Sequence, residues 1–172
     1  KELGNRVVEG QADKKELDKA IIIATKLVDD VALSQGNIKI YYEPNKLTEN
    51  SFIEQTIYVS VMSVVLGTKM GLSKQELVKL CVASLLKDIA LVSNKVEKDG
   101  KHSKEQHPRL GYEYLKKKYS LDEDILQAIL HHHERYDGSG YPNKIQGEDI
   151  NKYARIISVV DSFYEMKVNH TM

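Results

Sequence analysis

The spacing of apolar residues constrains this chain more than any other feature, because it follows the period of an α-helix through most of the 172 residues. No run of alternating polar and apolar residues predicts a sheet. Proline, which interrupts helices, occurs only at positions 44, 108 and 142, and each position suits a boundary between elements. The sequence therefore predicts an all-α fold.

Turn and capping residues divide this pattern into separate helices. Gly36 and Gly71 suit helix ends, and Ser73 with Glu76 forms a capping box for the helix that follows Gly71. We expect helices over residues 12–34, 48–69, 73–91, 108–118, 121–133 and 148–168, a connector or a short extended piece over 37–47 and a surface loop over 93–106.

Charge and cysteine content exclude several classes of function. The 25 basic and 25 acidic residues cancel, which gives no electrostatic reason to expect a nucleic-acid or membrane partner. The single cysteine, Cys81, excludes an internal disulfide and fits a buried position in a protein of the reducing cytoplasm. No segment approaches the ~20 apolar residues of a membrane span. Because the chain starts at Lys1 rather than at methionine, we expect a domain of a longer protein.

The segment 131–142 carries the strongest chemical signal, with the sequence His-His-His-Glu-Arg-Tyr-Asp-Gly-Ser-Gly-Tyr-Pro. A metal ion is the commonest reason to gather imidazoles so densely. Successive helix positions turn by about 100°, so His131, His132 and His133 cannot all face one point. We expect two of them to converge where the helix ends and the third to face solvent. His102 and His170 have no supporting context.

Two aspartates lie in strongly apolar helical stretches. Asp88 follows Lys87 between Leu-Leu and Ile-Ala, and Asp161 follows Ile-Ile-Ser-Val-Val. A buried carboxylate needs a partner, and taken singly each aspartate predicts an ion pair or a hydrogen bond between helices. Taken together with His107, His132 and His133, the two carboxylates are more typical of ligands for a metal cation.

These residues resemble the HD-GYP family, a branch of the HD-domain metal phosphohydrolases that hydrolyses the bacterial second messenger cyclic di-GMP. Residues 132–142 resemble its hallmark motif, and the resemblance spans roughly residues 40–170. It implies an HD-domain-like bundle of about six to seven helices over residues 48–172, preceded by a helix and connector over 1–47 that could link to an upstream domain. Further matching segments are 54–59, 85–89, 107–111 and 154–161.

The resemblance implies a metal centre, and this chain departs from the family pattern on one side of it. The family's first histidine falls on Gln55, its His-Asp catalytic dyad falls on Lys87 and Asp88, and its phosphate-binding lysine falls on Leu91. An amide oxygen is a weak ligand and an ammonium has no lone pair, so Lys87 would replace the charge of one metal. The implied metal ligands that remain are Asp88, His107, His132, His133 and Asp161.

Two hypotheses follow from this mixed set. In the first, the chain is a degenerate HD-GYP domain, a regulatory or protein-interaction module in cyclic di-GMP signalling. It holds one Fe, Mn or Zn ion, or none, on Asp88 and the three family histidines, and cyclic di-GMP or a related nucleotide is its implied ligand. In the second, it is an active two-metal cyclic di-GMP phosphodiesterase.

In the family the Gly-Tyr-Pro loop lies beside the active site and is a proposed docking surface for GGDEF-type domains. Its residues here are Arg135, Asp137, Gly138, Gly140, Tyr141 and Pro142, of which Arg135 and Asp137 are expected to hold the loop's shape.

Overall fold

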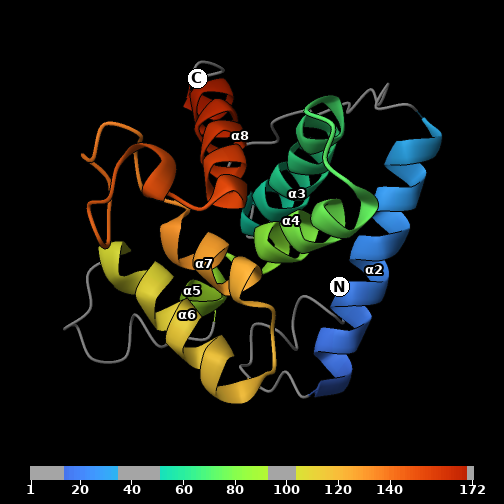
Figure 1. The fold of residues 1–172 in the computed structure, drawn as a ribbon, viewed down its shortest axis with the longest axis horizontal. Helices are drawn as coiled ribbons and strands as arrows, with labels where there is room; N and C mark the ends of the chain where they lie inside the picture. Colours follow the sequence, from blue (N-terminus) through green and yellow to red (C-terminus); the bar gives the residue numbers. More distant parts are fainter. Residues whose placement is uncertain (1–13, 35–50, 93–103, 170–172) are drawn as a thin grey trace.

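The computed structural model describes residues 14–34, 51–92 and 104–169, and every described element is helical. The expectation of an all-α bundle is confirmed (Figure 1). The elements are α2 (Lys14–Leu33), α3 (Ser51–Lys69), α4 (Lys74–Leu86), α5 (Ile89–Val92), η1 (Lys104–Gln106), α6 (His107–Lys118), α7 (Glu123–His131), η2 (Gly147–Asp149) and α8 (Lys152–Asn169).

Helix α4 forms the centre of the bundle. It packs against α2, α3, α7 and α8, while α6 packs against α5 and α7 on the other side (Figure 1). Four consecutive α4 residues, Leu80, Cys81, Val82 and Ala83, are all buried. A helix that is apolar on every side is expected at such a central position, because neighbours cover all of its faces. Cys81 is a free thiol in this core, and burial raises its pKa to about 12.

The predicted capping residues begin their helices as expected. Ser73 and Glu76 form the complete capping box of α4, and Asp122 caps α7 by accepting a hydrogen bond from the Asp124 backbone N–H at 2.9 Å. The last helix starts at Lys152 rather than near residue 148, so that boundary was wrong. The side chain of Asn151 explains the difference, because its Oδ1 accepts hydrogen bonds from the backbone N–H groups at the start of α8.

The helix expected over 73–91 is interrupted at Lys87 and Asp88, where α4 ends and α5 begins. The Leu91 N–H donates to the Asp88 carbonyl at 3.0 Å, a three-residue bond that tightens the turn. Successive residues of a regular helix point about 100° apart. Both side chains are nevertheless buried, with 2% of Lys87 and 8% of Asp88 exposed. The interruption therefore lets a consecutive Lys-Asp pair reach the interior together.

Helix α2 lies along the edge of the bundle and packs against α3 and α4 (Figure 1). Its buried residues Ala24, Val28 and Val31 recur at the helical spacing that predicts a helix over 12–34, and they form an apolar stripe on one face. The division into residues 1–47 and 48–172 stays a prediction. Gly36, the connector 37–47, most of the loop 93–106, His102 and His170 lie outside the described residues. Within the described ranges, no helix has the length and apolar character needed to cross a bilayer.

Candidate metal centre

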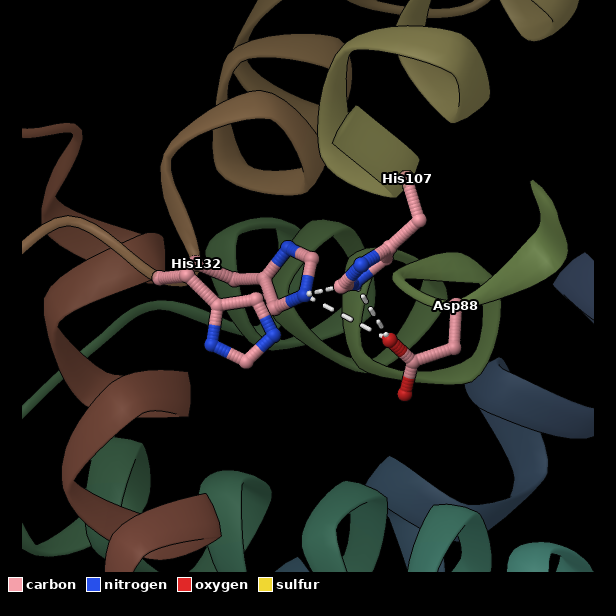
Figure 2. Close-up of side chains that lie close together, drawn as sticks. Asp88, His107 and His132 are labelled. Atoms are coloured by element: carbon pink, nitrogen blue, oxygen red, sulfur yellow. Dashed lines mark hydrogen bonds and ion pairs between the residues drawn. The ribbon is translucent and has the colours of Figure 1, made fainter. Parts of the chain in front are cut away.

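Four ligand-type side chains converge in the interior between α5, α6 and the end of α7. Asp88, His107, His132 and His133 each offer one ligand atom, and these atoms lie within 4.8 Å of one another. Asp88 Oδ1 lies 3.0 Å from His107 Nε2 and 3.4 Å from His132 Nε2, and the two Nε2 atoms are 3.1 Å apart. Figure 2 shows these three side chains pointing toward one another. The arrangement is that of a small cation site.

The chain brings each histidine to this point at a helix end. His107 is the first residue of α6, and Pro108 follows in the first turn, where its missing N–H costs no helical hydrogen bond. Helix α7 ends at His131, so His132 and His133 lie in the turn that follows, with ring centroids 4.2 Å apart. The expected convergence of two of the three consecutive histidines is confirmed. It depends on the helix ending there.

His131 does not face solvent, so that expectation was wrong. It is buried, and its Nδ1 accepts a hydrogen bond from the Asn151 backbone N–H at 3.4 Å. Its Nε2 lies 3.5 Å from the Asn143 side-chain amide. His131 thus connects the end of α7 to the segment before α8. Burial lowers the pKa of His131, which favours the neutral ring that these contacts use.

His132 and His133 are prepared to act as neutral ligands. His132 Nδ1 lies 2.6 Å from the carbonyl oxygen of Ile129, so Nδ1 carries the proton and Nε2 offers its lone pair to the cluster. Burial lowers the pKa of His132. Burial, together with His132 and His107, lowers the pKa of His133 to about 2. Neutral imidazole is the form that binds a metal.

A second cluster lies on the other side of Asp88 and contains Lys87, Asp161 and Gln55. The Lys87 ammonium donates to Asp88 Oδ2 and lies 3.4 Å from Asp161 Oδ2. The Gln55 side-chain amide donates to Asp161 Oδ1 at 2.9 Å. Protein donors therefore engage both oxygens of Asp161. Lys87 lies between the two carboxylates, which is the position it needs if its charge replaces that of one metal ion.

The charges of Lys87 and Asp88 are fixed at neutral pH. Burial alone would lower the pKa of Lys87, but its ion pairs with Asp88 and Asp161 outweigh burial and raise that pKa. Burial would likewise raise the pKa of Asp88, but the Lys87 ammonium and the hydrogen bond from His107 hold it well below its usual value. The ammonium and the carboxylate are therefore both ionised, which a buried pair requires for mutual stabilisation.

The two sides of the centre differ in whether their residues fit a metal. Three imidazole nitrogens and one carboxylate oxygen form a set that suits a single Zn²⁺, Fe²⁺ or Mn²⁺ ion. An ammonium with three N–H donors and an amide that donates its own N–H do not form such a set. Of the expected ligands, Asp161 lies with Lys87 and Gln55 rather than with the other four. Metal ligation by Asp161 stays a prediction.

The loop after α7 is held in shape by its own residues. Asp137 accepts hydrogen bonds from the Ser139 backbone N–H at 3.0 Å and from the Ser139 hydroxyl at 2.6 Å. Gly138 has a φ of +80°, which favours glycine. A Cβ on Gly140 would lie 2.3 Å from the backbone nitrogen of Arg135, so only glycine fits where these two segments cross. The side chain of Arg135 is exposed.

The end of this loop contacts the metal-type cluster directly. The ring of Tyr141 stacks on His133 with centroids 4.8 Å apart and planes 26° apart. The Tyr141 N–H also donates to the His133 carbonyl at 3.2 Å, and a cis peptide bond joins Tyr141 to Pro142. Burial raises the pKa of Tyr141 to about 12, so its hydroxyl stays protonated. The loop and the ligand His133 are therefore one packed unit.

Sequence reasoning missed one buried acid, Glu134, of which 2% is exposed. Its Oε1 accepts a hydrogen bond from the Asn143 N–H at 2.6 Å, which joins the two ends of the loop. The residues around Glu134 in the sequence are polar, so the apolar-context signal that identified Asp88 and Asp161 was absent. Its place directly after two ligand-type histidines was the available signal.

Comparison with known proteins adds family and fold to this geometry. A family model described as HD domain matches residues 43–171. The cyclic di-GMP phosphodiesterase response regulator RpfG of Xanthomonas campestris pv. campestris is 36% identical over 124 residues, which are 66% of this chain and 32% of that protein. Cyclic di-GMP phosphodiesterase PdeB of Borreliella burgdorferi is 28% identical over 132 residues, which are 72% of this chain and 35% of that protein.

A solved structure shares the fold. Bd1817, a HDG"Y"P protein from Bdellovibrio bacteriovorus, superposes with a TM-score of 0.74 at 19% identity. The match covers 96% of this chain and 57% of Bd1817. The chain spans about a third of the length of the two curated relatives described above.

Proposed function

Since the chain belongs to the HD-GYP family of HD domains, we propose that it is a degenerate member that binds one divalent metal ion and acts as a regulatory or protein-interaction module in cyclic di-GMP signalling. Hydrolysis of cyclic di-GMP is absent or very slow in this proposal. The proposed location is the cytoplasm, in keeping with a single, free cysteine. The loop 135–142 serves as a surface for a signalling partner, such as a GGDEF-type domain.

The position of the Lys87 ammonium is the observation that carries this proposal. Two unit charges about 4 Å apart interact by about 4 kcal/mol at an effective dielectric constant of about 20. A divalent ion at that distance from a buried ammonium would be repelled by about twice as much, or about 8 kcal/mol. The carboxylates that would offset this repulsion, Asp88 and Asp161, already pair with Lys87. A second metal ion on this side is therefore strongly disfavoured.

The remaining side of the centre retains its ligands. His107, His132, His133 and Asp88 would hold one divalent ion, which supplies Lewis acidity and can lower the pKa of a bound water. Lys87 holds Asp88 Oδ2, which leaves Oδ1 directed at His107 and His132. Asp88 would then hold the ion through one oxygen, because Lys87 already engages the other. In two-metal hydrolysis of a phosphodiester, the two ions stabilise the attacking and the leaving oxygen. This arrangement does not support that mechanism.

The alternative function is an active cyclic di-GMP phosphodiesterase. The names of the relatives RpfG and PdeB favour it, as does the convergence of four ligand-type residues. The two functions differ in catalysis and in the number of metal ions. We expect the purified chain, loaded with Mn²⁺ or Fe²⁺ without oxygen, to leave cyclic di-GMP intact. Turnover at the rate of a two-metal relative, measured by chromatography of the nucleotide products, would establish the alternative.

Restoring the missing ligands tests the physical reason for the proposal. The double variant Gln55→His with Lys87→His replaces the two residues that engage Asp161 by imidazoles. We expect its metal content to rise from one toward two equivalents per chain. Lys79→His is the matched control, because Lys79 also pairs with two carboxylates but lies at the surface of α4. A double variant that still holds one equivalent would show that Lys87 and Gln55 are not what excludes the second ion.

A further inference from the structure

The imidazole of His133 is held differently from that of its neighbour His132. His132 is fixed by a hydrogen bond, because its Nδ1 lies 2.6 Å from the Ile129 carbonyl oxygen. Among the described residues, none makes a hydrogen bond to the His133 ring, which instead contacts the rings of His107, His132 and Tyr141. Of these three rings only Tyr141 lies outside the metal-type cluster, and it stacks on His133 with planes 26° apart. The orientation of this ligand therefore depends on where Tyr141 lies.

Asn143, which directly follows the Gly-Tyr-Pro loop, fixes the end of the loop that carries Tyr141. The Asn143 N–H donates to Glu134 Oε1 at 2.6 Å. Its side-chain Oδ1 accepts a hydrogen bond from the Arg109 guanidinium at 2.6 Å, and its Nδ2 lies 3.5 Å from His131 Nε2. One asparagine thus joins helix α6, the end of α7 and the loop. We call Arg109, Glu134 and Asn143 the clasp.

The clasp connects the two segments that carry the histidine ligands. Arg109 lies two residues after His107 in the first turn of α6, and Glu134 directly follows His133. The Glu134 side chain is buried, so water competes little for its hydrogen bond within the clasp. The residue after the clasp, Lys144, has a φ of +56°, which is uncommon for a residue with a side chain. Such a backbone persists only where the surrounding contacts hold it in place.

We propose that Asn143 is a positioning residue for the metal ligand His133. By holding the loop end against Glu134 and Arg109, it places the Tyr141 ring, and that ring in turn sets the His133 imidazole. Asn143 itself does not contact the ion. Residues that orient a ligand without binding the metal typically change metal affinity by about 10- to 100-fold. The inference rests on the proposed function, which requires an ion at this centre, and it names the residue outside the ligand set on which the affinity depends.

Titration calorimetry of the whole chain with Mn²⁺ measures this dependence. Asn143→Ala should weaken Mn²⁺ binding by about 10- to 100-fold. Asn151→Ala is the matched control, because the Asn151 side chain also makes two hydrogen bonds to backbone N–H groups, but at the start of α8. The control should lower the urea midpoint through loss of the helix cap and leave the metal affinity close to that of the wild type. Equal Mn²⁺ affinities of the two variants would overturn the proposal.

Two further sets of variants test the route from Asn143 to His133. Arg109→Ala should also weaken Mn²⁺ binding, and it should add little to Asn143→Ala, because both changes remove the same hydrogen bond. Tyr141→Phe keeps an aromatic ring against His133, so it should recover most of the affinity that Tyr141→Ala loses. Fully additive effects of Arg109→Ala and Asn143→Ala, or a Tyr141→Phe variant as weak as Tyr141→Ala, would overturn the route.

Amide hydrogen exchange of the metal-free chain tests the clasp without any ion. The Tyr141 N–H donates to the His133 carbonyl at 3.2 Å, so its exchange rate reports how firmly the loop end is held on this ligand. Asn143→Ala should speed this exchange by about two- to tenfold, the effect of losing about one hydrogen bond, and Asn151→Ala should not. An unchanged rate in Asn143→Ala would overturn the proposal. A wild-type chain that binds no Mn²⁺ would instead refute the proposed function, and the exchange rate would still decide whether Asn143 positions His133.

Discussion

Replacing Lys87 by methionine should destabilise the domain far more than an exposed lysine-to-methionine change. Methionine has similar length but no charge, so it would leave the carboxylates of Asp88 and Asp161 without their shared cation. Removing one partner of a buried ion pair typically costs about 3–5 kcal/mol of unfolding free energy. Lys87 is 2% exposed, so solvent cannot replace the lost contacts. At about 2–4 °C per kcal/mol for a chain of this size, the expected fall in Tm is about 6–20 °C.

The assay is thermal and urea unfolding of metal-free protein, followed by circular dichroism. Lys79→Met is the control, because Lys79 lies on α4, directly before the turn that holds Lys87, and also contacts two carboxylates, Asp122 at 2.8 Å and Asp124 at 3.0 Å. Solvent screens that surface cluster, so the control should lose much less stability. A Lys87→Met variant as stable as Lys79→Met would refute the reasoning, since it would show that the buried carboxylates do not depend on the ammonium.

Metal ions should reverse part of this loss. If the carboxylates freed by Lys87→Met bind Mn²⁺, an ion concentration about 100 times the dissociation constant restores about 2.7 kcal/mol. The wild type should lack this additional stabilisation, because Lys87 occupies the position. An equal gain in the wild type and the variant would contradict the idea that lysine and the second metal compete.

Three further predictions follow from the same contacts. His107→Ala should reduce bound metal well below one equivalent per chain, measured by elemental mass spectrometry, because it removes one of four ligands. Gly140→Ala should destabilise the domain by about 1–3 kcal/mol or more and weaken metal binding, because its Cβ would lie 2.5 Å from the His133 carbonyl oxygen; an unchanged urea midpoint would contradict this. Hydrogen bonds from Lys152 and Ser73 lower the pKa of Glu76 from 4.5 to about 2. This depressed pKa gives stability that is present above about pH 4.5 and lost as pH falls toward 2, so the Tm difference between wild type and Glu76→Gln should shrink over that interval and not grow.

Much of the fold could be predicted because local signals and tertiary packing agree. The stripe with Ala24, Val28 and Val31 is buried as its spacing predicted, and the capping box of Ser73 and Glu76 is complete. The errors lie where a single side chain outweighs the periodic pattern. Helix α8 starts late because Asn151 caps it, and the helix expected over 73–91 breaks where a Lys-Asp pair must turn inward.

The sequence predicted those site residues whose charged side chains lie within apolar helical stretches. An aspartate in an apolar helix must find a partner, and this requirement identifies Asp88 and Asp161 from the sequence alone. Glu134 lies among polar neighbours, and His131 is the first of three consecutive histidines that cannot all face one way, so the burial of these two residues could not be inferred from local sequence. Their burial depends on how the loop and the segment before α8 close over the end of α7, through Asn143 and Asn151. Contacts between segments this far apart in the chain produce no periodic pattern in the sequence.

The number of metal ions per chain tests the central claim most directly. The claim is that Lys87 reduces an HD-GYP centre to a single metal site formed by Asp88 and three histidines. Protein loaded anaerobically with excess Fe²⁺ or Mn²⁺ and then desalted should contain one equivalent per chain by elemental mass spectrometry. Two equivalents in the wild-type chain, with Lys87 intact, would contradict the account.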